Sequence, residues 1–168
     1  MTKKNFNTIS DVIYQHAGIV LKEIKEDMVY SRVSRRIRIT GSRGFDDYLK
    51  LALATGSDEF THFVNAITTN LTSFFRESHH FDFITQTALP GWKATPGRQR
   101  LRIWSAGSST GEEAYSIAMT LADQVPKNWD TKILATDVDT DVVAQGDSGI
   151  YTQERINGLS KSLVTQHF

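Results

Sequence analysis

The chain has 168 residues, of which 39% are hydrophobic, so it can form one ordinary domain or two small domains with packed cores. It has no cysteine, which excludes disulfide bonds and thiolate metal sites. No segment approaches the roughly 20 apolar residues of a membrane-spanning helix, and the N-terminus lacks the apolar region of a signal peptide. We therefore expect a cytoplasmic protein without direct membrane insertion.

The first ninety residues carry helical patterns only. The expected helices are one capped by Thr8 or Ser10 and ending at Gly18, followed by helices at residues 25–40, 46–53, 57–67 and 77–85. Two Pro-Gly steps, Pro90-Gly91 and Pro96-Gly97, then indicate a linker. The sequence thus predicts an all-helical domain at residues 1–90 and a second domain at residues 91–168.

The second domain begins with a strand pattern at residues 101–104, then a helix at 112–125. A second strand at 132–135 and a helix near 141–145 follow. Strand, helix and strand in this order predict a βαβ unit with a parallel, Rossmann-like sheet. The overall class is therefore α plus α/β.

The glycine turn between the first strand and the helix is the candidate ligand site. Its Gly107 and Gly111 are four residues apart and lead into Glu112-Glu113, which fits neither a phosphate-binding P-loop nor a dinucleotide fingerprint. Asp137 follows the second strand, where α/β nucleotide folds place an acid that binds ribose hydroxyls. A cofactor with a ribose, an amine and a positive centre fits, as in S-adenosylmethionine. A tight turn without a ligand is the alternative if the glycines are considered alone.

Four motifs carry a resemblance to a known family. They are NLTSFFRE (70–77), WSAGSSTGEEAYSI (104–117), ATDVDT (135–140) and SGIY (148–151). In order and spacing, they resemble the signatures of CheR-type chemoreceptor glutamate methyltransferases. Leu71 and Ala114 stand where that family usually has glutamate and proline.

The resemblance implies an activity and its cofactor. The family's activity is S-adenosylmethionine-dependent methylation of glutamate side chains on the cytoplasmic helices of chemoreceptors, in chemotaxis adaptation, with S-adenosylhomocysteine as product. A glutamate carboxylate is already ionised at neutral pH, so this reaction requires no general base. The family's later strands and its inserted β-subdomain have no counterpart in residues 1–168. We therefore expect these residues alone to be catalytically inactive, and their two-stranded sheet to pair with a second copy, a swapped element or a further part of its own chain.

The resemblance also implies which residues form the site. Arg76 is the expected catalytic cation, Glu113 and Asp137 hold the adenosine end, and Glu112 only complements the helix dipole. The full set of expected cofactor-binding residues is Asn70, Thr72, Arg76, Gly107, Gly111, Glu113 and Asp137. No metal site is expected, because His79 and His80 are adjacent on a helix and cannot share one face.

The basic residues of the second helix indicate a partner. Residues 1–56 carry 10 Lys and Arg against 6 Asp and Glu, although the whole chain is neutral. The expected substrate-binding residues are Arg32, Arg35, Arg36 and Arg38, on the side of the helix opposite Val29, Val33 and Ile37. An acidic receptor helix bundle is the favoured partner. For these arginines the alternatives are a solvated face and nucleic-acid binding, which the neutral charge of the chain disfavours. For the chain as a whole, the alternative function is a non-catalytic module that binds S-adenosylmethionine or a partner protein.

Overall fold

The structure, a computed structural model, describes residues 1–97 and 99–168, and these divide into two compact units. The first unit contains Met1–Thr69 with the short segment Val138–Thr140, and the second contains Asn70–Asp137 with Asp141–Phe168. The division therefore falls at Asn70, ahead of the boundary that we expected after residue 90. The reason is that Phe81 and Leu89 are buried in the core of the second unit.

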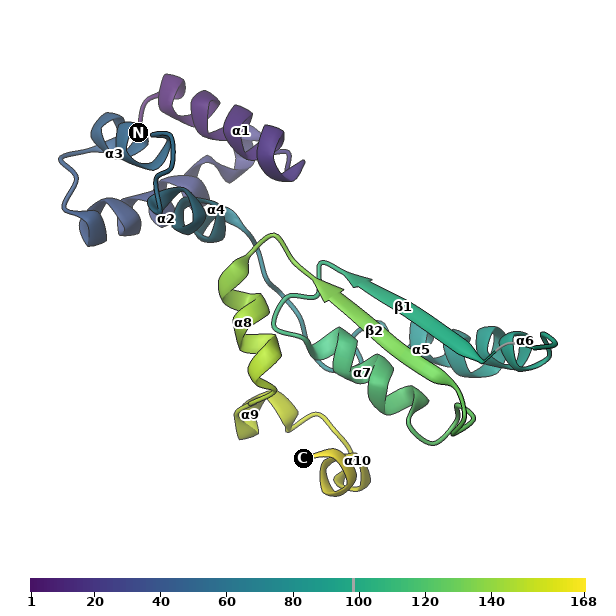
Figure 1. The fold of residues 1–168 in the computed structure, drawn as a ribbon. Coiled ribbons are helices and arrows are strands. Elements are labelled where there is room, and N and C mark those ends of the chain that lie inside the picture. The colour runs from purple at the N-terminus through teal and green to yellow at the C-terminus, as the bar shows by residue number, and fades with distance from the viewer. Residues whose placement is uncertain (98) are drawn as a thin grey trace. The chain divides into compact units, whose positions relative to one another are not determined.

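The first unit is all helical, as the sequence predicts. Its elements are α1 (Lys3–Ala17), a short 3-10 turn (Glu23–Lys25), α2 (Glu26–Thr40), α3 (Phe45–Ala52) and α4 (Glu59–Ile67), shown in Figure 1. Helix α1 begins earlier than expected because Thr2 forms a capping box. The Thr2 hydroxyl accepts from the Asn5 amide at 3.2 Å, and the Asn5 side chain accepts from the Thr2 amide at 2.8 Å.

The core of the first unit is built from one apolar stripe on each helix. Ile9 and Ile13 of α1 are completely buried, as are Val29 and Val33 of α2. Their spacing of four residues places each pair on a single face of its helix. The sequence predicted the stripe of α2, but not Ile9, which lies inside a helix that begins earlier than expected.

After the loop at residues 70–78, the second unit has three short consecutive helical segments. These are α5 (His79–Phe83), a π-helical segment (Ile84–Ala88) and α6 (Leu89–Lys93). The linker expected at Pro90-Gly91 is wrong, because both residues lie inside α6. Proline is tolerated in the first turn of a helix, where its missing N–H would have no helical partner.

The remainder of the second unit is the expected α/β arrangement. It contains β1 (Arg100–Ala106), α7 (Glu112–Leu121), β2 (Asp130–Thr136), α8 (Thr140–Ser148), α9 (Gln153–Ile156) and α10 (Lys161–His167). The two strands pair in parallel with Ile103 opposite Ile133, and α7 runs beside them (Figure 1). Ile117 and Leu121 of α7 are buried with Leu101 of β1.

Across residues 1–97 and 99–168, no helix is both long enough and apolar enough to span a bilayer.

Candidate cofactor-binding site

The glycine turn is tied to the end of β2. The amides of Gly107 and Ser108 both donate to the carbonyl of Thr136, at 2.8 and 2.9 Å. Gly107 has a φ of +80°, and a Cβ built on it would meet no atom within 4 Å. The backbone at Gly107 is therefore open to close approach by a ligand, at the edge where parallel strands bind cofactors.

Gly111 has a different reason for being glycine. Its φ is +95°, and an added Cβ would lie 2.8 Å from the Tyr151 hydroxyl and 3.2 Å from the Gly146 Cα. The missing side chain thus leaves room for the protein's own packing. We expected it to leave room for the cofactor, and the sequence pattern gave no sign of this internal role.

Asp137 lies beside the turn, as its position after β2 predicts. Its carboxylate accepts a hydrogen bond from the Ser109 amide at 2.8 Å. The Ser109 hydroxyl in turn donates to the Asn70 carbonyl at 3.1 Å. These contacts bring together three parts of the sequence that we assigned to one site: the motif at 70–77, the glycine turn and the residue after β2.

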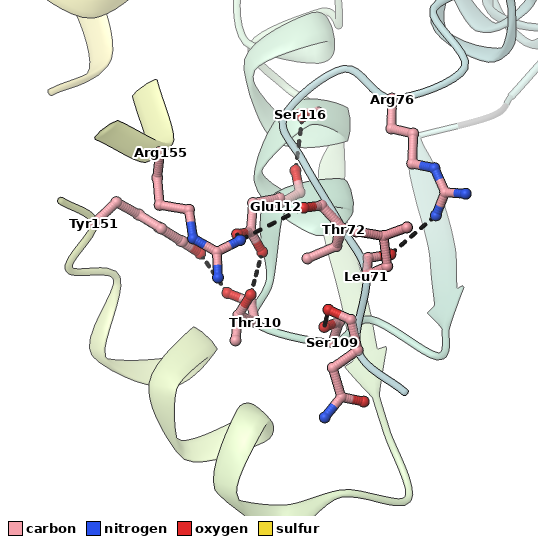
Figure 2. A network of polar contacts seen from close by, with 10 residues as sticks. Leu71, Thr72, Arg76, Ser109, Thr110, Glu112, Ser116, Tyr151 and Arg155 are labelled. Atoms are coloured by element: carbon pink, nitrogen blue, oxygen red, sulfur yellow. Dashed lines mark hydrogen bonds and ion pairs between the residues drawn. The ribbon is translucent and has the colours of Figure 1, made fainter. Parts of the chain in front are cut away.

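Arg76 is exposed at the end of the loop that Asn70 begins. Its guanidinium Nη1 donates to the Leu71 carbonyl at 2.9 Å, as Figure 2 shows, so the side chain folds back over its own loop. Among the described residues this is the guanidinium's one hydrogen bond. Its remaining N–H groups can therefore donate to a carboxylate of a ligand.

The two glutamates at the start of α7 have different surroundings. Glu113 is exposed and accepts from the Ser105 hydroxyl at 2.6 Å, so it can reach a ligand at the end of β1. Glu112 is completely buried. Its carboxylate accepts from the Thr110 hydroxyl at 2.6 Å and from the Arg155 guanidinium at 3.1 Å. Glu112 therefore has a charge partner in addition to the helix dipole that we expected.

Tyr151 and Arg155 complete the enclosure of Glu112 (Figure 2). The Tyr151 hydroxyl donates to the Thr110 carbonyl at 2.7 Å. Burial, and then the charge of Glu112, raise the pKa of Tyr151 above its ordinary value, so the hydroxyl stays protonated as a donor. Sequence reasoning noted Tyr151 only as a motif residue and did not find Arg155, which lies 43 positions from its partner.

The four arginines of α2, which we expected to act together in substrate binding, have different surroundings. Arg32 donates to the Ala66 and Ile67 carbonyls at 3.3 and 3.0 Å and also to the Thr68 carbonyl, so it caps the end of α4. Arg35 and Arg38 are exposed.

Arg36 is bound inside the first unit. It contacts the Glu59 carboxylate through two hydrogen bonds of 2.9 and 2.7 Å, and the Tyr48 hydroxyl donates to the same carboxylate at 2.8 Å. Burial alone would raise the pKa of Glu59, but the hydrogen bonds from Arg36 and Tyr48 outweigh it and lower the pKa. Arg36 therefore holds α2 to α4.

A hollow of about 300 Å³ is lined by residues of the turn, α7, β2 and α8. Small and apolar side chains form most of its lining, among them Ala114, Ala118, Ile133 and Val143. The charged and hydrogen-bonding side chains Glu113, Arg76 and Asp137 are not part of it. Asp147 and the turn residues Ser108 and Ser109 also line this hollow.

The donors and acceptors beside Gly107 fit S-adenosylmethionine. The Asp137 carboxylate, the exposed Glu113 and the open backbone at Gly107 lie at the carboxyl ends of two parallel strands. These features define a Rossmann-like nucleotide-cofactor domain that follows an all-helical unit.

Comparison with models of known protein families identifies the family to which the chain belongs. The model of the CheR methyltransferase all-alpha domain matches residues 4–68, and that of the CheR methyltransferase SAM-binding domain matches residues 70–168. The chain therefore belongs to the CheR methyltransferase family, and its cofactor is S-adenosylmethionine. The two matches meet where the structural units divide.

The chain is also similar to curated chemotaxis protein methyltransferases. The chain is 44% identical to a chemotaxis protein methyltransferase of Escherichia coli (strain K12) and 43% identical to that of Salmonella typhimurium. Both matches cover 100% of this chain and 57% of the relative. The chemotaxis protein methyltransferase of Klebsiella aerogenes is 41% identical with the same coverage. The chain thus spans a little over half the length of these relatives.

Proposed function

We propose that the protein methylates glutamate side chains on the cytoplasmic regions of chemoreceptors, in chemotaxis adaptation, and that it acts in the cytoplasm. The observation that carries this proposal is the placement of the Asp137 carboxylate, held by Ser109 beside the open turn at Gly107. The family and the names of the relatives support it.

Each candidate residue has a separate task in this proposal. Asp137 accepts hydrogen bonds from the ribose hydroxyls, and Glu113 provides a second acidic contact at the end of β1. Gly107 lets the backbone approach the ligand. Arg76 binds and orients a carboxylate through the N–H groups that Leu71 leaves available. When bound, the cofactor supplies an electrophilic methyl group on its sulfonium.

The chain's main contribution to the reaction is positioning. The attacking glutamate is ionised at neutral pH, so no residue has to remove a proton from it. Holding the carboxylate in line and excluding water supply the rate enhancement in a reaction of this kind. The protein therefore needs neither a general base nor a nucleophile of its own at the turn.

Arg35 and Arg38 are the proposed receptor-binding residues of α2. Both are exposed on a helix whose other two arginines, Arg32 and Arg36, bind other parts of the first unit. The inner arginines hold α2 in place, and the outer pair presents positive charge to an acidic receptor helix. Such surface charge acts mainly on the rate of encounter.

Transfer of a tritiated methyl group from S-adenosylmethionine to membranes that contain chemoreceptors tests this proposal. With the full-length protein we expect label in the receptor band, released as methanol in base because the product is a methyl ester. The Asp137→Ala variant serves as the control with a damaged cofactor site. Binding of S-adenosylhomocysteine without any transfer would instead support the non-catalytic module.

A further inference from the structure

The backbone on both sides of Arg76 is strained. Phe75 has a φ of +52° and Glu77 a φ of +55°, and neither is glycine. The left-handed region is unfavourable for side chains with a Cβ, most of all for bulky ones. Such a conformation persists only where the surrounding structure holds it. The contacts of Phe75 therefore show what fixes Arg76.

Two contacts anchor Phe75, one through its ring and one through its backbone. The ring packs edge-on against Phe81, with 5.1 Å between the ring centroids. The amide donates to the hydroxyl of Ser116 at 2.9 Å. Ser116 is completely buried in α7 and donates its own proton to the Glu112 carbonyl at 2.6 Å. The orientation of this hydroxyl leaves its oxygen available as an acceptor for Phe75.

We propose that Ser116 is a positioning residue for Arg76. By accepting the Phe75 amide it holds the left-handed turn, and the turn sets the direction in which Arg76 leaves the backbone. Arg76 itself is exposed and is held only weakly, by an amide contact of 3.3 Å to the Ser73 carbonyl and by its contact with Leu71. This inference rests on the proposed role of Arg76 in the cofactor site.

Thr120 is a helical hydroxyl with which the role of Ser116 can be compared. Serine and threonine in helices often donate to the carbonyl four residues earlier, and Thr120 does so to Ser116 at 2.7 Å. No described residue donates to the Thr120 hydroxyl. Ser116 and Thr120 therefore lie one turn apart on α7 with the same helical bond, and only Ser116 accepts the Phe75 amide. Thr120→Ala is the matched control.

The test is a double-mutant cycle read by calorimetric titration of S-adenosylhomocysteine into the full-length protein. Ser116→Ala should weaken binding about 3- to 10-fold when Arg76 is present, the range expected for loss of one hydrogen bond. In an Arg76→Ala background the same change should alter binding less than about 2-fold, because the residue that it positions is gone. Thr120→Ala should leave binding unchanged in both backgrounds.

Amide hydrogen exchange supplies a second measurement. The Phe75 amide should exchange faster in Ser116→Ala than in the parent, and at the parental rate in Thr120→Ala. If Ser116→Ala does not fold, Ser116→Cys replaces it in the same cycle, since a thiol of similar shape is a weaker acceptor.

These experiments distinguish an error in the proposed role of Arg76 from an error in the inference about Ser116. If Arg76→Ala binds S-adenosylhomocysteine as tightly as the parent, the role of Arg76 is wrong and the inference about Ser116 falls with it. If Arg76→Ala weakens binding but Ser116→Ala has the same effect in both backgrounds, only the inference is overturned. An unchanged exchange rate at Phe75 in Ser116→Ala would also overturn it.

Discussion

Removal of the Arg155 guanidinium should destabilise the second unit through Glu112. The side chain of Glu112 is 1% exposed and that of Arg155 is 44% exposed. Breaking a fully buried ion pair costs about 3–5 kcal/mol, because a charge is left without a partner in a poor solvent. Water reaches Arg155, and Thr110 still donates to the carboxylate, so we expect a smaller loss of about 2–3 kcal/mol for Arg155→Met.

Arg102 provides a matched control on β1. Its side chain is 42% exposed, close to that of Arg155, but its partner Asp130 is 50% exposed. Arg102→Met should therefore destabilise the second unit much less than Arg155→Met, as for other solvated pairs. The two arginines are similarly accessible to water, and Arg102 also donates to the Leu101 and Asp130 carbonyls, so a smaller loss in Arg102→Met points to burial of the carboxylate.

Urea unfolding followed by tryptophan fluorescence measures these differences. All three tryptophans of the sequence, Trp92, Trp104 and Trp129, belong to the second unit, so the signal reports on that unit. A loss of about 2–3 kcal/mol lowers the urea midpoint by about 1–2 M. The double variant Glu112→Gln with Arg155→Met should recover to within about 1 kcal/mol of the parent, since no charge remains buried. The reasoning is refuted if Arg155→Met behaves like Arg102→Met, or if the double variant is as unstable as Arg155→Met alone.

Three further predictions follow from the charged groups. Asp137→Ala should weaken binding of S-adenosylhomocysteine by about 1–3 kcal/mol in calorimetry, and unchanged affinity would remove Asp137 from the site. Reversing the charge of Arg35 and Arg38 should slow receptor methylation at low salt and make the methylation rate less dependent on salt, while cofactor affinity stays constant. Normal methylation rates would mean that these two arginines only form a solvated face. The lowered pKa of Glu59 means that its stabilising contribution is full above its ordinary value of 4.5 and is lost as the pH falls through the lower folded-state value. Circular dichroism should accordingly show less acid destabilisation in Glu59→Gln than in the parent, and equal acid sensitivity would contradict the assignment.

Local sequence patterns predicted the elements that have a clear period. The apolar stripe of α2 and the strand, turn and helix around Gly107 follow from residue spacing and from the glycine turn. The helices α9 and α10 were not predicted, because they are short and carry few apolar residues. The linker was wrongly expected at Pro90 because the sequence does not distinguish a proline in the first turn of a helix from a proline in a loop. The burial of Leu89 in the core of the second unit shows that this segment is helical and packed.

The candidate site was predictable where a motif carries the chemistry directly. Asp137 and Gly107 stand at positions that the fold class gives to ligand contacts. Contacts between distant parts of the sequence were not predictable from spacing. Arg155 pairs with a residue 43 positions away, and the division of the α2 arginines into internal and exposed ones depends on where Glu59 lies. A helical wheel shows which side of a helix a residue occupies, but not which neighbour packs there.

The most direct test of the cofactor site is an NMR titration of residues 1–168 with S-adenosylhomocysteine, which detects even weak binding. We expect amide shifts at Gly107, Ser109, Asp137 and the loop that carries Arg76. Shifts confined to the hollow between α7, β2 and α8, at residues such as Ala118 and Val143, would contradict this placement of the cofactor.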